Sequence, residues 1–432
     1  MDTNCNIRIF DKDINFLGEV DSFTSLFFIR KWETYGEFEF HLSNIDNTII
    51  KKDNIIMINK DGNKAGIIEH IEINEENKED ILIKGFSLLY WLTNRITVPP
   101  EGYAYHSFNA NVETIMIDLV NTNVINPLDI KRKIPNLIIE ASKGRGDRLQ
   151  FQTRFKNLAD ELTKLSKLSG LGVTVDLDYK KKKFVFRVVE GQNLSYGQAE
   201  NPPYIFSLDY DNIKKQNYIE SNIGYKNVGY VAGQGEGIDR TIEVLGNERI
   251  GLDRREVFVD ARDIDSDTSL IDRGRVKLSE YKQIQSFESE VDTKDYKLLW
   301  DLGDIITTVD KKRGLKVDNR ITEIKEVYEN EGIKLEPTFG NPIPGLADKI
   351  KQMTDTPSEG SSSTSLGGDK SYEFNQLSPK KDWNIMHGLN KYPNVTVVDS
   401  AGNKVIGDIK YIDNNNITIS FTAAFAGIAY FN

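Results

Sequence analysis

The chain has 432 residues, of which 39% are hydrophobic and 10% aromatic, with a formal net charge of −11 and a sequence pI near 5.2. This length predicts three or four domains with real hydrophobic cores, and the composition excludes a disordered chain. The acidic balance disfavours tight binding to nucleic acid, which depends on Lys and Arg side chains at the phosphates.

Cys5 is the only cysteine, so we expect neither a disulfide within the chain nor a cysteine metal cluster. The first residues lack the basic end and apolar stretch of a signal peptide, and no run of about 18 apolar residues occurs. We therefore expect a protein that is made in a cytoplasm and does not span a membrane.

Residues 1 to about 108 predict a first β domain, a twisted antiparallel sheet or barrel. Its strands are short runs rich in β-branched and aromatic residues: Ile7–Phe10, Phe23–Lys31, Glu37–Leu42, Ile55–Asn59, Gly66–Ile73 and Ile81–Lys84. Asp61-Gly62 predicts a tight hairpin with positive φ at both turn positions. Phe86–Asn94 predicts one short helix packed on the sheet.

Residues from about 109 to 203 predict an α+β insert, because the apolar period changes there from two to 3.6. One helix is expected after Asn111, which is placed to cap it, and a second over Phe155–Leu165, ending by Gly170. Two strands follow, Val173–Leu177 and Phe184–Val189. The four lysines between them are typical of a solvated hairpin tip rather than of a nucleic-acid patch.

The stretch from Gly224 to Arg262 contains three closely spaced glycines, Gly233, Gly235 and Gly237. They permit positive φ and a sharp turn between the predicted strands Val228–Val231 and Thr241–Leu245. A third strand, Glu256–Val259, follows Asp253-Arg254-Arg255. A nucleotide fingerprint needs a helix directly after the glycines, whereas the residues here alternate like a strand.

A second β domain is predicted over about 233–345, and the first is completed by about 204–232. The second contains one helix, marked by Leu270, Leu278 and Tyr281, and the strands Ser286–Val291, Ile305–Val309, Leu315–Tyr328 and Ile333–Phe339. Strands flanking one helix describe both β domains, so the two are candidates for structural duplicates.

A Gly/Ser-rich linker over 346–370 and a small C-terminal β module over 371–432 complete the chain. The strands expected in the module are Asn394–Val398, Lys404–Tyr411, Asn416–Phe421 and Gly427–Phe431. Trp383, Tyr392 and Tyr411 could stack on sugars, but aromatic residues in so small a domain more often form its core.

Catalytic motifs are absent from the sequence. The four histidines lie far apart, and there is no zinc helix, phosphate loop, nucleophile elbow or calcium loop. Acidic pairs such as Asp301 with Asp304 are too abundant to mark a glycosidase. We therefore assign no catalytic, metal-binding or cofactor-binding residue and expect no cofactor and no enzyme.

Two motifs, V-A-G-Q-G-E-G-I-D-R and G-L-D-R-R-E-V-F-V-D-A-R-D, are similar to the siphophage Gp37-like family of tail proteins, relatives of the phage tail hub. Gly36–Leu42, Leu302–Ile306 and Arg320–Ile324 agree with it, so the resemblance covers about residues 1–345. It implies a multidomain, mainly β fold with two tail-tube-like barrel or sandwich domains.

The resemblance further implies a structural hub, formed as a homotrimeric ring at the distal end of a phage, prophage or tailocin tail and made in the bacterial host cytoplasm. Its expected partners are the tail tube, other tail-tip or baseplate proteins, the tape-measure protein and a spike or fibre. An acidic channel would pass DNA without tight binding. Gly233, Gly235 and Gly237 are expected where the chain leaves the first β domain for the second, and Arg254, Arg255 and Arg262 at carboxylates in domain or subunit contacts.

Two alternative functions stay open at this point. One is a tail-associated cell-wall hydrolase, which the short C-terminal module argues against, because related hub proteins that carry such an enzyme place it after the hub. The other is a receptor-binding or carbohydrate-binding role confined to the C-terminal module.

Overall fold

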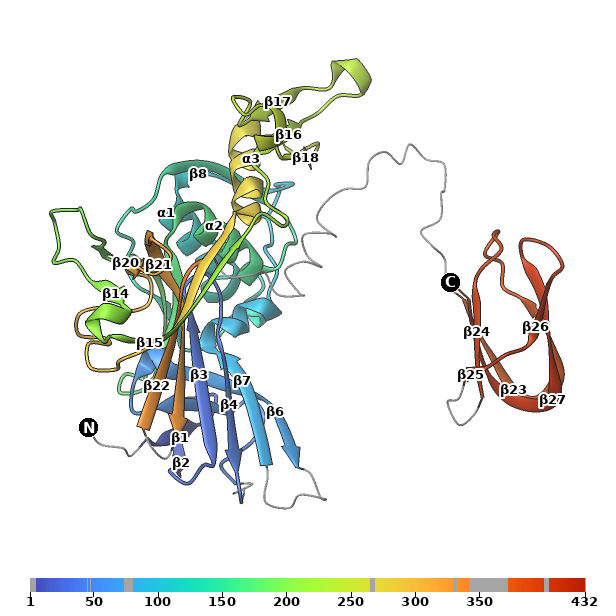
Figure 1. Cartoon of the computed structure of the whole chain (residues 1–432), viewed down its shortest axis with the longest axis horizontal. Helices are drawn as coiled ribbons and strands as arrows, with labels where there is room; N and C mark the ends of the chain where they lie inside the picture. Colours follow the sequence, from blue (N-terminus) through green and yellow to red (C-terminus); the bar gives the residue numbers. More distant parts are fainter. Residues whose placement is uncertain are drawn as a thin grey trace. The chain divides into compact units, whose positions relative to one another are not determined.

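The computed structural model describes residues 5–44, 46, 48–73, 81–264, 269–329, 332–341, 372–399 and 404–431. The chain divides into two compact units, residues 1–357 and 358–432. The predicted linker, 346–370, lies outside the described residues. The prediction of a mainly β fold with an α+β insert is confirmed, and Figure 1 shows the strands of both units.

A 14-stranded sheet dominates the first unit, and its main path runs β15-β19-β22-β21-β3-β4-β7-β6-β5-β1-β2. The strands are β1 (Ile7–Phe10), β2 (Phe16–Val20), β3 (Ser25–Lys31), β4 (Glu37–Leu42), β5 (Ile55–Ile58), β6 (Ala65–Ile73), β7 (Ile81–Ser87), β13 (Asn193–Leu194), β14 (Ile205–Ser207), β15 (Ile213–Ser221), β19 (Ile284–Val291), β20 (Ile305–Asp310), β21 (Leu315–Glu329) and β22 (Gly332–Asn341). Among the described residues, the path ends at β15 and β2 without closing into a barrel.

The two predicted β domains meet within this sheet. Antiparallel pairing of β3 with β21 places Leu26 opposite Tyr328 and Lys31 opposite Glu323. β15, which we assigned to the first domain, pairs instead with β19 of the second. The periodicity identifies each segment as a strand, but the choice of neighbour depends on contacts between distant residues.

The sheet has two similar halves on either side of the β3–β21 junction. From the junction outward, the first half runs β3, β4, β7, β6 and the second runs β21, β22, β19, β15, with every neighbouring pair antiparallel. The two strands nearest the junction come first along the chain in the first half (β3 and β4) and last in the second half (β21 and β22). The halves therefore share one strand arrangement in circularly permuted order.

Alternating side chains of the strands form the cores of the sheet. Phe38 and Phe40 of β4 point to the same face, and Phe28 of β3 stacks on Phe38 with 6.1 Å between the ring centroids. Gly85 of β7 leaves room for this ring, because a Cβ there would lie 2.5 Å from Phe38 Cζ and 1.9 Å from the Ile67 carbonyl oxygen. A second core surrounds Trp300 and Phe339 in the other half.

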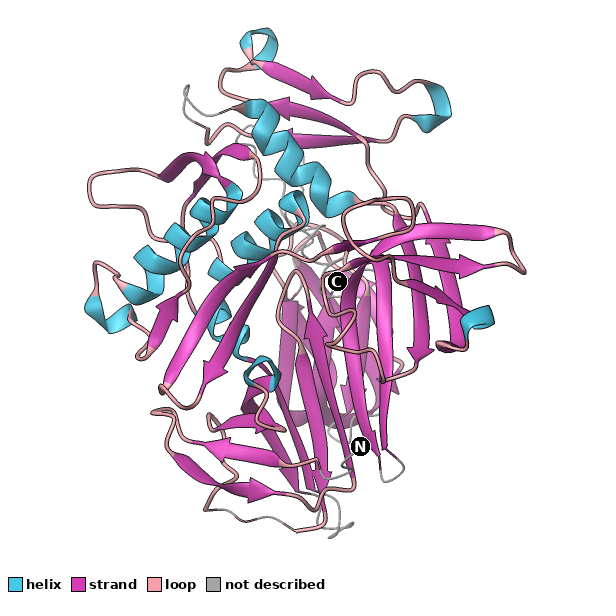
Figure 2. Cartoon of the chain, turned by 90° about the vertical axis from the view of Figure 1, so that its left-hand side faces the viewer, coloured by secondary structure: helices cyan, strands magenta, loops and turns pink. Residues whose placement is uncertain are grey.

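The α-helices gather at one end of the long strands (Figure 2). The insert contains η3 (Asn121–Ile125) and η4 (Ile130–Arg132) with β8 (His106–Asn111), α1 (Val112–Val120), β9 (Leu137–Ile139), β10 (Arg148–Thr153), α2 (Leu158–Ser169), β11 (Gly172–Asp178) and β12 (Lys183–Val189). As predicted, Asn111 caps α1 by accepting a hydrogen bond from the Thr114 N–H at 2.9 Å, and Gly170 ends α2 in the left-handed conformation. β11 pairs with β12 across the predicted lysine turn.

Two local predictions need correction. α2 begins at Leu158 rather than Phe155, because Asn157 caps it and Phe155 has a positive φ of 52°. The connection between β5 and β6 is a hairpin, but its positive φ values fall at Asn59 and Lys60. Asp61 instead caps η1 (Gly62–Lys64), and the short helix predicted over Phe86–Asn94 is η2 (Leu88–Asn94).

The second unit is a five-stranded sheet made of β23 (Tyr372–Met386), β24 (Val395–Asp399), β25 (Lys404–Val405), β26 (Asp408–Tyr411) and β27 (Asn416–Phe431). The two strands predicted after Asn416 are one long strand, the run predicted over Lys404–Tyr411 is divided in two, and β23 escaped prediction because its sequence is largely polar. Trp383 is fully buried in the core, whereas Tyr392 is 68% exposed.

Candidate assembly site

A small three-stranded unit carries the motif on which the family resemblance rests. Its strands are β16 (Val228–Ala232), β17 (Ile242–Leu245) and β18 (Glu256–Asp260), in the order β17-β16-β18, and α3 (Leu270–Leu278) packs on them at the top of Figure 1. Val231, Val257 and Val259 form its core with Ala261, Ile264 and Tyr281. The unit is inserted between β15 and β19 of the large sheet.

The three predicted glycines lie in the turn between β16 and β17. Gly235 and Gly237 have positive φ values of 100° and 55°, while Gly233 adopts no left-handed conformation. A Cβ on Gly235 would lie 2.6 Å from the Asp239 carbonyl oxygen, so the turn requires glycine at this position. These glycines thus turn the chain within the small unit, and the chain re-enters the large sheet only at β19.

The small three-stranded unit contains the same turn twice, with the sequences Gly237-Ile238-Asp239-Arg240 and Gly251-Leu252-Asp253-Arg254. The two glycines have φ values of 55° and 56°, and each turn forms a short 3₁₀ helix, η6 (Gly237–Asp239) and η7 (Gly251–Asp253). In each, the arginine N–H donates to the glycine carbonyl oxygen, at 3.4 Å and 3.2 Å respectively. The central aliphatic side chains, Ile238 and Leu252, are 100% and 97% exposed.

Each turn is held by the side chain of its own arginine. The Arg240 guanidinium donates to the carbonyl oxygens of Gly233 and Ala232 at 3.0 Å and 2.9 Å and lies over the ring of Phe258. Arg254 lies over the ring of Tyr230 and donates to its hydroxyl at 2.8 Å and to the Arg249 carbonyl oxygen at 3.1 Å. Because each arginine side chain fixes the conformation of its own turn, the exposed side chains of Ile238 and Leu252 project from well-defined turns.

The three predicted arginines have different partners within the chain. Arg254 forms an ion pair with Glu256, which raises the pKa of Arg254, and Arg262 forms one with Asp260 at 2.7 Å. Arg255 lies 6.0 Å from the ring centroid of Tyr225. Their predicted role at subunit contacts stays a prediction.

The ion pair of Arg240 with Asp260 was not predicted from the sequence; its Nη2 and Oδ1 atoms lie 2.6 Å apart. Hydrogen bonds from Arg262 and then from Arg240 lower the pKa of Asp260 to about 2, although partial burial opposes this shift. The repetition of Asp-Arg at 239–240 and 253–254 was the signal that could have drawn attention to Arg240.

The Asp260 carboxylate is expected to stabilise the first unit only when it is ionised. Its folded pKa lies below the ordinary value of 3.8, so its contribution is present above about pH 4 and is lost as the pH falls toward 2. The shift corresponds to about 2 kcal/mol. We expect Asp260→Asn to cost about this much at pH 6, with the difference from wild type shrinking below pH 4 in urea titrations. A difference that is constant between pH 6 and pH 2.5 would contradict this assignment.

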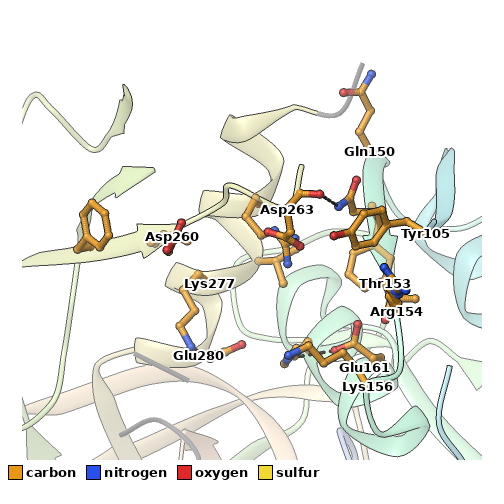
Figure 3. Close-up of a pocket in the computed structure, with 17 residues that line it drawn as sticks. Tyr105, Gln150, Thr153, Arg154, Lys156, Glu161, Asp260, Asp263, Lys277 and Glu280 are labelled. Carbon is orange, nitrogen blue, oxygen red and sulfur yellow. Dashed lines mark hydrogen bonds and ion pairs between the residues drawn. The ribbon is translucent and has the colours of Figure 1, made fainter. Parts of the chain in front are cut away.

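A cavity of about 550 Å³ lies where the small unit meets the insert. Figure 3 shows Asp260, Asp263, Lys277 and Glu280 on one side, facing residues of the insert on the other. The buried side chains of Phe151, Val259 and Val276 supply apolar lining. The Gln150 N–H donates to Asp272 at 2.9 Å, and the Gln152 amide donates to the Asp263 carbonyl oxygen at 2.7 Å, so these contacts tie the two walls together.

Most charges in the cavity wall are paired with one another. Arg273 pairs with Asp263 at 2.6 Å, Lys277 with Glu280 at 2.8 Å and Lys164 with Glu161 at 3.0 Å. Arg154 and Lys156 are exceptions, since neither has a carboxylate partner among the described residues. Arg154 lies over the rings of Tyr105 and Phe155 instead. The cavity therefore combines an apolar lining with two cations that can form ion pairs with carboxylates.

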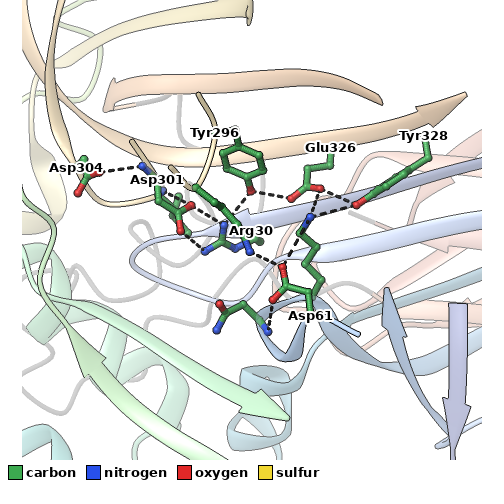
Figure 4. Close-up of polar contacts among 11 residues, drawn as sticks. Arg30, Asp61, Tyr296, Asp301, Asp304, Glu326 and Tyr328 are labelled. Carbon is green, nitrogen blue, oxygen red and sulfur yellow. Dashed lines mark hydrogen bonds and ion pairs between the residues drawn. The ribbon is translucent and has the colours of Figure 1, made fainter. Parts of the chain in front are cut away.

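A buried polar cluster joins the two halves of the large sheet at the β3–β21 junction (Figure 4). Arg30 of β3 donates to Asp301 at 2.7 Å and to the Tyr296 hydroxyl at 2.9 Å. Lys64 pairs with Glu326 of β21 at 2.5 Å, and the hydroxyls of Tyr296 and Tyr328 donate to Glu326 at 2.7 Å and 2.6 Å. Two ion pairs between residues more than 250 positions apart along the chain, Arg30 with Asp301 and Lys64 with Glu326, thus connect the two halves at the junction.

The pKa shifts in this cluster favour a charged Arg30 and a protonated Tyr328. Burial opposes the charge of Arg30, but Tyr296 and Asp301 raise its pKa well above the ordinary value. Burial and the Glu326 carboxylate raise the pKa of Tyr328, so this hydroxyl stays protonated and donates. The chemistry of the cluster is therefore that of a structural contact: each group neutralises or hydrogen-bonds another.

No group of three or more His, Cys, Asp or Glu side chains in the described ranges is arranged to hold a metal ion. In the same part of the chain, no helix has the length and apolar character needed to cross a lipid bilayer.

The structure is that of a mainly β protein. Its most prominent side-chain clusters, in the small unit and at the β3–β21 junction, form ion pairs and hydrogen bonds within the chain. Residues 6–341 match the family described as Siphovirus ReqiPepy6 Gp37-like protein, and the chain belongs to this family of phage tail proteins. No curated protein sequence matched the chain.

Solved structures of phage tail proteins are similar to this chain. The 43 kDa tail protein of prophage MuSo2 from Shewanella oneidensis is 16% identical, with a TM-score of 0.50 over 78% of this chain and 98% of that one. Prophage tail protein gp18 from Listeria monocytogenes is 13% identical, with a TM-score of 0.49 over 81% of this chain and 99% of that one. The family identifies the protein as a component of a phage or phage-like tail.

Proposed function

We propose that the protein is a structural hub, of which three copies form a ring at the distal end of the tail. The ring would adapt the tail tube to the tip, spike or fibre. The observation that carries this proposal is the pair of similar sheet halves in one chain, which share the strand order described above.

The sheet halves explain why three copies would suit a tube. Each chain contributes two four-stranded antiparallel halves, joined by the β3–β21 ladder, the buried Lys64–Glu326 pair and the partly exposed Arg30–Asp301 pair. Three chains in a closed cyclic arrangement would therefore present six similar surfaces, which matches a tube with sixfold symmetry. We propose that the halves act as the two tail-tube-like domains.

The net charge of −11 supports an acidic or neutral channel through the ring. Such a surface repels nucleic acid phosphates, so DNA or a tape-measure protein would pass without being held. The expected neighbours in the particle are the tail tube, other tail-tip or baseplate proteins and the tape-measure protein.

We assign an outward contact to the C-terminal module, residues 371–432. It has its own core around Trp383 and forms a compact unit of its own. We propose that its partner is a spike, a fibre or a cell surface. We propose no enzymatic role, because the family is one of structural tail proteins and the sites described above offer contacts rather than positioned reacting groups.

The test combines mass measurement of the purified protein with electron microscopy of native particles. We expect a trimer at micromolar concentration and a threefold ring at the end of the tail tube. A protein that stays monomeric at this concentration, in particles without such a ring, would contradict the hub. Release of soluble fragments from peptidoglycan by the purified chain would favour the hydrolase instead.

A further inference from the structure

We propose that the turn Ile250–Asp253 of one copy docks in the cavity between β10, α2, β18 and α3 of a neighbouring copy. This contact rests on the proposed ring and names the surfaces through which its copies meet. The occupant of the cavity is thus a second copy of this chain, bound through two aliphatic side chains and one carboxylate.

The turn Ile250–Asp253 exposes two aliphatic side chains that can serve as an apolar contact. Ile250 and Leu252 are 79% and 97% exposed, although they belong to a turn that Arg254 anchors through Arg249 and Tyr230. A rigid apolar tip loses little conformational entropy when it is buried, so it suits an interface anchor. Asp253 follows Leu252 directly, is exposed and has no cation partner for its side chain among the described residues.

The cavity complements this turn in shape and charge. Its volume of about 550 Å³ and its lining by Phe151, Val259 and Val276 suit aliphatic side chains. Arg154 and Lys156, which lack carboxylate partners in the described part of the chain, stand at the cavity and can receive Asp253. Burial of Ile250 and Leu252 would place the unpaired carboxylate of one copy beside the unpaired cations of the next.

The sheet topology places the turn and the cavity at opposite ends of the small unit. β16 runs parallel to β18 and antiparallel to β17, so the turn between β17 and β18 lies at the end where β18 begins. Phe258, Val259 and Asp260, which line the cavity, lie toward the other end of β18. A contact between unlike ends runs in one direction around a set of copies, and it forms a closed ring when the rotation from one copy to the next closes after three copies, as the proposed hub requires.

The repeated turn provides a matched control for the test. Leu252→Asp and Ile238→Asp change equally exposed residues in turns of the same sequence pattern, but Ile238 lies at the end of the unit that carries the cavity. We expect Leu252→Asp to weaken trimer formation at least tenfold, measured by analytical ultracentrifugation, and Ile238→Asp to leave it within twofold. Unchanged thermal unfolding of both variants would show that the fold is intact.

A charge exchange tests the pairing itself. Asp253→Lys and Lys156→Glu are each expected to weaken association several-fold, and the double variant should recover most of the loss because the ion pair is restored in reverse. As a direct measure, Leu252→Cys and Lys156→Cys chains, each carrying Cys5→Ser, are mixed and treated with a short bis-maleimide. A cross-linked product containing one chain of each kind supports the contact.

The results separate this contact from the hub as a whole. If Leu252→Asp still forms the wild-type trimer and no mixed product appears, the copies meet elsewhere and the contact is wrong while the hub stands. Equal losses from Ile238→Asp and Leu252→Asp would also overturn the one-directional contact. If the wild-type chain forms no trimer in solution or in particles, the proposed hub fails together with it.

Discussion

Replacing Glu326 by Gln is expected to lower the free energy of unfolding of the first unit by about 3 kcal/mol, because breaking a buried ion pair is costly and Lys64 keeps only the more distant Asp61 carboxylate, at 3.9 Å. The Glu326 side chain is 1% exposed and that of Lys64 is 10% exposed. Glu326 also accepts hydrogen bonds from the hydroxyls of Tyr296 and Tyr328, so three side chains lose their acceptor charge together. Urea unfolding measured by circular dichroism would determine the loss.

The control for this experiment is Glu329→Gln on the same strand. Glu329 forms an exposed ion pair with Lys334, and exposed pairs contribute at most about 1 kcal/mol. The double variant Lys64→Met with Glu326→Leu should recover only the part of the loss that comes from the unpaired Lys64 charge, because the hydroxyls of Tyr296 and Tyr328 still lack their acceptor. Equal stabilities of the Glu326→Gln and Glu329→Gln variants would show that the buried cluster does not hold the β3–β21 junction.

Replacing Trp383 by Ala is expected to unfold the C-terminal module. Trp383 is fully buried, and its ring lies 5.1 Å from those of Phe421 and Phe425. Truncating a buried Trp costs about 3–5 kcal/mol, which is comparable to the whole stability of a module of this size. Hydrogen exchange followed by mass spectrometry should show full loss of protection in peptides from residues 372–431.

The same measurement tests whether the module folds independently. Peptides from β3, β4 and β7 should keep wild-type protection in the Trp383→Ala variant if the two units fold separately. Tyr392→Ala is the control, because Tyr392 is 68% exposed and its loss should leave protection in the module nearly unchanged. Simultaneous loss of protection in both units would contradict a tethered, independently folded module.

The elements that local chemistry specifies were predictable from the sequence. Asn111 and Gly170 mark helix ends because a capping side chain and a left-handed residue satisfy backbone groups within one turn. The period-two pattern of Glu37–Leu42 identifies β4 with its observed bounds. The family resemblance likewise rested on short motifs that can be read directly.

The site was only partly predictable. The glycines and Arg254 and Arg262 were selected from the motif, and they do lie in one small unit. The pairing of Arg240 with Asp260 and the cavity beyond it were not predicted, because Phe151 of β10 and Val276 of α3 are 125 positions apart in the sequence. Local periodicity carries no information about which distant faces meet.

The sequence by itself determined the fold class, the strands with clear alternation, the two long helices of the insert and the family. Only the tertiary structure decided that β3 pairs with β21, that the two β halves form one sheet, and that Arg30, Lys64 and Glu326 form a buried cluster there. The physical reason is that helix caps and strand alternation arise from neighbouring residues, whereas strand partners and buried ion pairs are selected by the burial of surfaces far apart along the chain.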